Sequence, residues 1–125
     1  MTEAEMTDTE RVGQPGGLSV VSADSDGIRV ITLCGEIDYQ TCGPLRQAFE
    51  ASAPFTSRVV ADLRGVGFMD STGINILITA HHGFTAAGGW LRLAAPTAAV
   101  LRVIQLVGVD ALIDCHDTLE QALIP

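Results

Sequence analysis

The chain has 125 residues, with 15 acidic and 7 basic side chains and a formal net charge of -8 at pH 7. All of the basic residues are arginines, which excludes mechanisms that depend on a phosphate-binding lysine or a Schiff-base lysine. Because binding to nucleic acid relies on a basic face that neutralises phosphates, so acidic a chain is not expected to bind DNA or RNA directly.

Residues 1–17 differ in composition from the rest of the chain. They contain four acidic residues, one arginine and almost no large apolar side chains, and they end in Gly-Gln-Pro-Gly-Gly. Such a segment cannot bury enough apolar surface to offset the entropy of ordering it. We therefore expect residues 1–17 to be a flexible acidic tail and residues 18–125 to form a single domain.

The first half of this domain is rich in β-strand signals. An Asp-Gly turn at residues 24–27 separates two alternating runs, residues 18–22 and 28–34, which is typical of a β-hairpin. Residues 35–39 are expected to form a loop, and residues 40–52 a helix that ends before Pro54. The apolar run at residues 58–63 predicts a strand buried inside a sheet.

The second half alternates helices and strands. Helical spacing of apolar residues after Asp70 predicts a helix that ends at the glycine pair 88–89, followed by a strand over residues 90–94. Pro96 and Thr97 open another helix, which Gly108 ends; a short strand at 112–113 and a helix over 117–123 complete the chain. This order predicts an α/β fold with a mixed four- to five-stranded sheet, an opening hairpin and right-handed parallel crossovers.

No segment has the length and apolarity of a transmembrane helix. The longest apolar stretch, residues 98–113, is interrupted by charged and polar residues and is shorter than the roughly 20 residues that a spanning helix needs. The acidic first eleven residues are unlike a signal peptide, so we expect a cytoplasmic protein with no membrane partner. Cys34, Cys42 and Cys115 match neither a metal-binding pair nor a disulfide framework, and we expect them to be reduced and mostly buried.

The most informative stretch is Gly-Val-Gly-Phe-Met-Asp-Ser-Thr-Gly-Ile at residues 65–74, between a buried strand and an apolar helix. Its polar residues would lie at the carboxyl end of a strand, where open α/β sheets present functional groups. A purely structural interpretation also stays open: Asp70 and Ser71 cap the helix, and Gly73 allows close packing.

Catalytic and metal-binding interpretations of the sequence are weak. Met69 stands where the nucleophile elbow of a serine hydrolase requires glycine. Asp38 and Asp62 could in principle pair with Asp70, but no substrate pocket or electrophile accompanies them. The adjacent His81 and His82 lack a third ligand at suitable spacing, so we expect an ordinary pair on a helix surface. Trp90, at the start of a strand, is expected in the core.

Three segments together resemble the STAS domain of bacterial anti-sigma-factor antagonists. They are Leu-Cys-Gly-Glu-Ile-Asp at residues 33–38, Val-Val-Ala-Asp-Leu at 59–63 and Phe-Met-Asp-Ser-Thr-Gly-Ile at 68–74. The resemblance runs from about residue 18 to residue 123, and it is specific because two distinctive motifs occur in the right order. It implies the STAS fold.

The resemblance also implies a partner switch. In such proteins the serine that follows the motif aspartate, here Ser71, is phosphorylated by an anti-sigma factor with ATP-dependent serine kinase activity. The unphosphorylated antagonist binds that kinase and releases the sigma factor, and a serine phosphatase resets the system. The chain would then regulate transcription indirectly, as a monomer, with no catalytic residue, cofactor or metal of its own.

Roles are assigned to individual residues by the same resemblance. Ser71 is the expected phosphoacceptor and Thr72 the fallback, although the Thr72 hydroxyl is expected to turn toward the backbone. Asp70 would orient the Ser71 hydroxyl or cap the helix, and Gly73 would admit the partner or pack against the sheet. Asp38 would lie on the same edge as Ser71, cap a helix starting near residue 40, or do both. The expected partner-binding residues are Glu36, Asp38, Asp70, Ser71, Thr72 and Gly73.

Two alternatives remain open at this point. One is a STAS scaffold or interaction module that does not switch, for example in a stress-sensing assembly. The other is an antagonist controlled by the redox state of two of the three cysteines, Cys34, Cys42 and Cys115.

Overall fold

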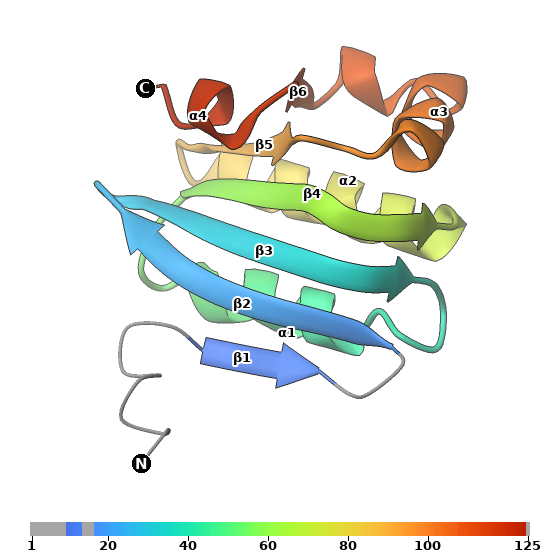
Figure 1. Ribbon diagram of the computed structural model, residues 1–125. Helices are drawn as coiled ribbons and strands as arrows, with labels where there is room; N and C mark the ends of the chain where they lie inside the picture. The colour runs from blue at the N-terminus through green and yellow to red at the C-terminus, as the bar shows by residue number, and fades with distance from the viewer. Residues whose placement is uncertain (1–9, 14–16, 125) are drawn as a thin grey trace.

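The computed structural model describes residues 10–13 and 17–124, which form one sheet flanked by helices (Figure 1). In chain order the elements are β1 (Glu10–Gly13), β2 (Leu18–Ser25), β3 (Ile28–Ile37), α1 (Gly43–Ser52), β4 (Arg58–Met69), α2 (Ser71–Ala86), β5 (Trp90–Ala94), α3 (Ala98–Leu106), the 3-10 helix η2 (Val109–Ala111), β6 (Asp114–His116) and α4 (Leu119–Ala122). The predicted α/β class with an opening hairpin followed by alternating helices and strands is confirmed.

The sheet has six strands in the order β1-β2-β3-β4-β5-β6. The pairs β1–β2 and β2–β3 are antiparallel, whereas β3–β4, β4–β5 and β5–β6 are parallel. Asp26 and Gly27 make the turn between β2 and β3, with φ angles of 52° and 83°. Positive φ angles at both central residues are typical of two-residue hairpin turns, because they match the right-handed twist of the two strands.

Strand β1 corrects two predictions. Residues 10–13 belong to the segment expected to be a tail, yet they pair with residues 19–22 of β2 and extend the sheet beyond the four or five strands expected. The pairing uses main-chain groups of an edge strand, which an apolar pattern in the sequence does not reveal. The other residues of the predicted tail, 1–9 and 14–16, lie outside the described residues.

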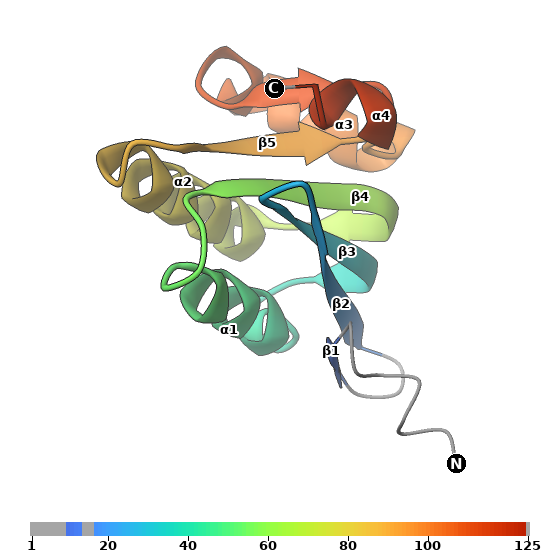
Figure 2. The same cartoon turned by 90° about the vertical axis from the view of Figure 1, so that its left-hand side faces the viewer.

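The main core lies on the face of the sheet that α1 and α2 cover (Figure 2). Alternate residues of β4 point to opposite faces: Val59 and Ala61 join this core, and Val60 joins a smaller cluster on the other face, against α4. Trp90, predicted in the core, is only partly buried at the margin of the smaller cluster, where the Arg92 guanidinium lies 3.7 Å from the centre of its ring.

Several boundaries differ from the predicted ones. Strand β3 continues through Ile37, into the stretch predicted as a loop, and β4 runs six residues beyond the predicted end to Met69. Helix α1 begins at Gly43 rather than near residue 40, and the last strand is Asp114–His116 rather than 112–113. Because β3 and β4 are longer than predicted, the candidate site lies at their carboxyl ends, at Ile37 and Met69.

Candidate functional site at the carboxyl ends of β3 and β4

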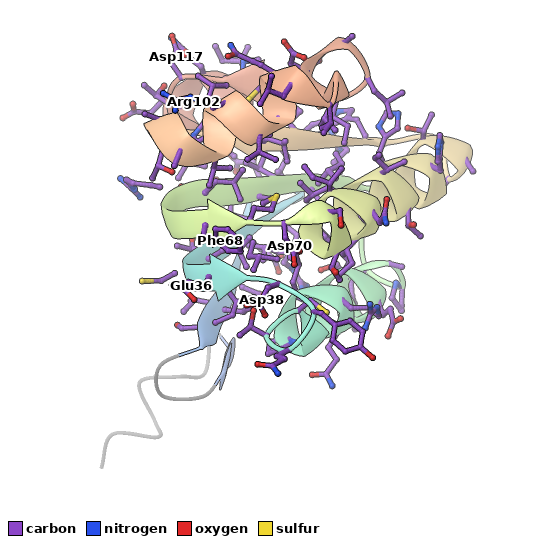
Figure 3. All side chains as sticks on the ribbon, turned by 90° about the vertical axis from the view of Figure 1, so that its right-hand side faces the viewer. Glu36, Asp38, Phe68, Asp70, Arg102 and Asp117 are labelled. Carbon is purple, nitrogen blue, oxygen red and sulfur yellow. The ribbon has the colours of Figure 1, made fainter. Side chains whose placement is uncertain are left out.

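The ends of β3 and β4 bring together two segments that are distant in sequence. Ile37 is paired with Met69, and the backbone N–H of Asp70 donates to the carbonyl of Ile37 at 3.1 Å. Asp38 and Asp70 therefore follow neighbouring strand ends, and Figure 3 shows both, with Glu36 and Phe68, at the same edge. The sequence-based prediction that Asp38 and Ser71 open on one edge is correct.

Asp70 is the cap of helix α2. Its Oδ1 accepts hydrogen bonds from the backbone N–H groups of Thr72, at 2.9 Å, and Gly73, at 3.3 Å. Asp70 was predicted either to orient the Ser71 hydroxyl or to cap the helix, and in the structure its carboxylate caps the helix. Two N–H groups at the start of α2 are thus already paired, so a phosphate on Ser71 would meet a carboxylate rather than a set of free donors.

Ser71 is the first residue of α2 and is exposed. Among the described residues, its hydroxyl makes no hydrogen bond with side chain or backbone, so it is sterically available to another protein. The Thr72 hydroxyl also makes none, contrary to the expectation that it turns toward the backbone. Thr72 is partly buried and faces a groove between α1 and α2.

Gly73 is buried against the sheet. A Cβ atom at this position would lie 2.7 Å from Cγ of Met69 and 2.8 Å from Cγ2 of Ile37. Both distances are shorter than van der Waals contact, so glycine lets α2 start directly on the ends of β3 and β4. The packing role predicted for Gly73 is supported, and a direct contact with a partner is not.

Asp38 organises the loop between β3 and α1. Its Oδ1 accepts from the backbone N–H groups of Gln40 at 2.9 Å and Thr41 at 3.0 Å, and the backbone N–H of Asp38 donates to the Thr41 hydroxyl at 2.9 Å. The expected role as cap of the first helix is wrong, because α1 starts later and Cys42 is its capping residue. Asp38 instead fixes a turn that leaves Glu36 and Tyr39 exposed.

Two exposed aromatic side chains flank this edge and were missed by the sequence analysis. Phe68 is 48% exposed and pairs with Glu36 across β3 and β4, and Tyr39 is 82% exposed on the Asp38 loop. No regular alternation marked Phe68: between Val66 and Met69, which are buried, both Gly67 and Phe68 are exposed. Exposed aromatic residues of this kind are common anchors of protein interfaces.

The structure separates the carboxylates that might have formed a catalytic pair. Asp62 is buried in the middle of β4. It precedes Asp70 by eight residues, which corresponds to roughly 25 Å along an extended strand. It forms an ion pair with Arg64 at 3.0 Å. The Asp38 carboxylate accepts hydrogen bonds within its own turn, from the backbone N–H groups of Gln40 and Thr41. In the described part of the chain, no three side chains of metal-binding type gather, and no helix has the length and apolarity to cross a membrane.

The three cysteines are free and lie apart in the fold. Cys34 is exposed on β3, Cys42 is buried, and Cys115 is half-buried on β6, so the expectation of mostly buried thiols fails for Cys34. Cys34 lies on β3 and Cys115 on β6, and β4 and β5 lie between these two strands, so β3 and β6 are about 14 Å apart. Disulfide bonds require Cα atoms within about 7 Å, so this pair cannot form in the folded chain.

Comparisons with known proteins agree with this architecture. The family model of the STAS domain matches residues 19–122, which is most of the chain, and the chain belongs to the STAS domain family. The anti-sigma-F factor antagonist RsfB of Mycobacterium tuberculosis is 32% identical over 112 residues, covering 87% of this chain and 89% of RsfB.

Solved structures give the same fold. The crystal structure of an anti-sigma factor antagonist from Mycobacterium paratuberculosis superposes with a TM-score of 0.80 and 32% identity, covering 90% of this chain and 96% of that protein. A putative anti-sigma factor antagonist from Thermotoga maritima, 18% identical, superposes with a TM-score of 0.77 and covers 82% and 89% of the two chains. At that identity the likeness concerns the fold alone.

Proposed function

We propose that this protein is an anti-sigma-factor antagonist, a regulator without catalytic activity of its own, and that phosphorylation of Ser71 switches it off. Its partner would be an anti-sigma factor with ATP-dependent serine kinase activity, and a serine phosphatase would restore the binding form. The observation that carries the proposal is the exposed Ser71 hydroxyl at the start of α2, on the edge shared with Asp38 and Phe68. The names of the similar mycobacterial proteins support the antagonist role.

The surroundings of Ser71 explain how a phosphate would act. Phosphorylation adds about -1.5 to -2 charge, next to the Asp70 carboxylate and on the edge that also holds Glu36 and Asp38. Because Asp70 already occupies the N–H groups of Thr72 and Gly73, the helix end offers the phosphate little compensation. The added charge and bulk would therefore remain on the surface, where they oppose a partner that fits a neutral hydroxyl.

The test combines mapping of the modified residue with binding. The purified chain is incubated with candidate anti-sigma factors from the same genome and ATP-Mg, and the site is identified by peptide mass spectrometry. We expect one phosphate on Ser71. The Ser71→Ala variant should keep binding the partner and resist modification, whereas Ser71→Glu should bind at least about tenfold more weakly. Thr72→Val is the matched control and should still be phosphorylated.

The same experiment separates the alternatives. A scaffold that does not switch would bind its partners equally well with Ser71→Ala and Ser71→Glu, and no kinase would modify it. Redox control would require a disulfide, and the separation of Cys34 from Cys115 argues against that pair within one chain. Thiol trapping under oxidant that leaves all three cysteines free would exclude redox control altogether.

A further inference from the structure

The groove between α1 and α2 is a well-defined concavity of the described residues, and apart from Thr72 none of the residues that line it enters the function proposed above. It encloses about 530 Å³, within the range of roughly 300 to 1,000 Å³ typical of small-molecule sites. Its floor is apolar: Phe49 and Phe84 meet edge to face with ring centres 6.1 Å apart, and Ile76 is buried beside them. An apolar floor on a helix pair favours a ligand with a hydrocarbon body.

Small residues keep the groove open beyond this floor. The groove is lined there by Ala80 and Gly83 of α2 and by the residues that follow the two helices, Ala53 and Ala87, so no large side chain closes the space between the helices. From Asn75 to its last residue, Ala86, α2 rises about 16 Å. The groove is thus long as well as apolar, a shape that suits an extended chain better than a compact ring system.

Three polar side chains of the groove gather at one end, and Glu50, Thr56 and Thr79 lie further along it. Helices α1 and α2 both begin at the carboxyl edge of the sheet, and Arg46, Thr72 and Asn75 lie in or next to their first turns. Among the described residues, Arg46 forms no ion pair and donates only to Cys42 Sγ, at 3.9 Å, while the side chains of Thr72 and Asn75 make no hydrogen bond. One guanidinium, one hydroxyl and one amide therefore remain to bind a polar head group.

The charge of this end selects the kind of head group. Arg46 is the one cation of the groove, and an arginine can bind a carboxylate through two parallel hydrogen bonds. Glu50, the one acid, is exposed one turn further along α1, so an anionic head group would be repelled from the middle of the groove and held at its Arg46 end. We propose that the groove binds a medium-chain fatty acid, with its carboxylate at Arg46 and its chain over Phe49 and Ile76.

The first test is titration calorimetry of the full chain with decanoate, kept below the concentration at which it forms micelles. We expect saturable binding, weakened about tenfold or more by Arg46→Gln, because a charge-assisted hydrogen bond is lost. The matched control is Arg102→Gln, which removes an exposed cation of α3 outside the groove and should leave the affinity unchanged.

The second test blocks the groove. A Cβ atom at Gly83 would contact nothing within 4 Å, so Gly83→Leu should fold, place its side chain in the groove and abolish decanoate binding. Gly83→Ala, which adds only a methyl group, should still bind. Decyltrimethylammonium, with a similar chain and the opposite charge, should not bind detectably.

Defined results would overturn the inference. They are absence of decanoate binding, equal effects of the two arginine changes, or undiminished binding by a folded Gly83→Leu variant. Equal affinity for the alkyl cation would also overturn it and would indicate an apolar groove without carboxylate recognition, as expected of one that seats a protein segment. None of these readouts involves a kinase or Ser71, so the inference can fail while the proposed function stands.

Discussion

Gly73 and Gly83 lie on the same helix, but an added methyl group meets different surroundings at each. At Gly73 it would approach Met69 and Ile37 to less than 3 Å, whereas at Gly83 it meets nothing within 4 Å. Gly73→Ala should therefore lower the free energy of unfolding by about 1 to 3 kcal/mol through overpacking. Gly83→Ala should raise it by up to about 1 kcal/mol through helix propensity. Urea denaturation measures both, and equal effects would contradict the packing role of Gly73.

The three cysteines should differ in reactivity. The thiolate is the reactive form, and burial, followed by the nearby carboxylates of Asp110 and Asp117, raises the pKa of the Cys115 thiol. With iodoacetamide at about pH 8, we expect exposed Cys34 to be alkylated first, half-buried Cys115 more slowly and Cys42 last. Peptide mass spectrometry follows the order, and in urea the three should react alike. Rapid labelling of Cys115 in the folded chain would refute the assignment.

The same shift affects stability in alkaline solution. A pKa that is raised in the folded state means that folding favours the neutral thiol of Cys115. Its contribution to stability is therefore complete below the ordinary pKa, 9.0, and is lost as the pH rises through the folded-state pKa. Cys115→Ser should show a smaller loss of stability than the parent protein as the pH rises above 9.0, measured by urea denaturation.

Helix α3 is attached to the sheet through its capping residue. The Thr97 hydroxyl accepts from the backbone N–H of Val100 at 3.4 Å and donates to the carbonyl of Val66 at 2.8 Å. Thr97→Ala should cost about 1 to 3 kcal/mol, because the cap is lost and the Val66 carbonyl of β4 loses its donor. Thr118→Ala removes only a cap, on the four-residue α4, and should cost less. Thermal unfolding compares the two, and a larger loss for Thr118→Ala would be contrary to this account.

The same elements show where sequence patterns suffice. Strand β5 and the starts of helices α2 and α3 were predicted to within two residues, because apolar periodicity and helix-start residues are local signals. The ends of β3 and β4 were not predicted correctly, because the glycines near these ends are typical of turns. In the sheet, a Cβ atom at Gly65 would lie 2.9 Å from the Leu33 carbonyl, so glycine lets the two strands approach. The need for glycine at residue 65 thus depends on a contact with β3, which the local sequence does not show.

The candidate site was predicted in the same uneven way. Asp70 and Ser71 could be placed at a helix start from local residue types alone. The exposure of Phe68 and the pairing of Ile37 with Met69 depend on the register of two parallel strands, which lie more than 30 residues apart in sequence. The direction of Thr72 into a groove depends on the placement of α1. The residue types at the start of the helix were therefore predictable from the sequence. Their arrangement at the carboxyl ends of β3 and β4 was predicted only in part.

At the scale of the whole molecule, the acidity of the chain, with a net charge of -8, bears on the proposed switch. A phosphate on Ser71 would join Asp70, Asp38 and Glu36 on one edge, so part of its effect on a partner should be long-range repulsion. Salt reduces such repulsion, because the screening length falls from about 10 Å at 0.1 M to about 3 Å at 1 M ionic strength. Contact and steric effects do not depend on salt in this way.

Comparing Ser71→Glu with Ser71→Gln isolates the charge, since the two side chains have nearly the same size. We expect Ser71→Glu to bind the cognate anti-sigma factor more weakly than Ser71→Gln at about 0.1 M NaCl, and the ratio of the two Kd values to fall toward one near 1 M. Calorimetry at several salt concentrations measures this ratio, with the parent protein as reference. A ratio independent of salt would assign the effect to the close fit around the hydroxyl, because only screened charges respond to ionic strength.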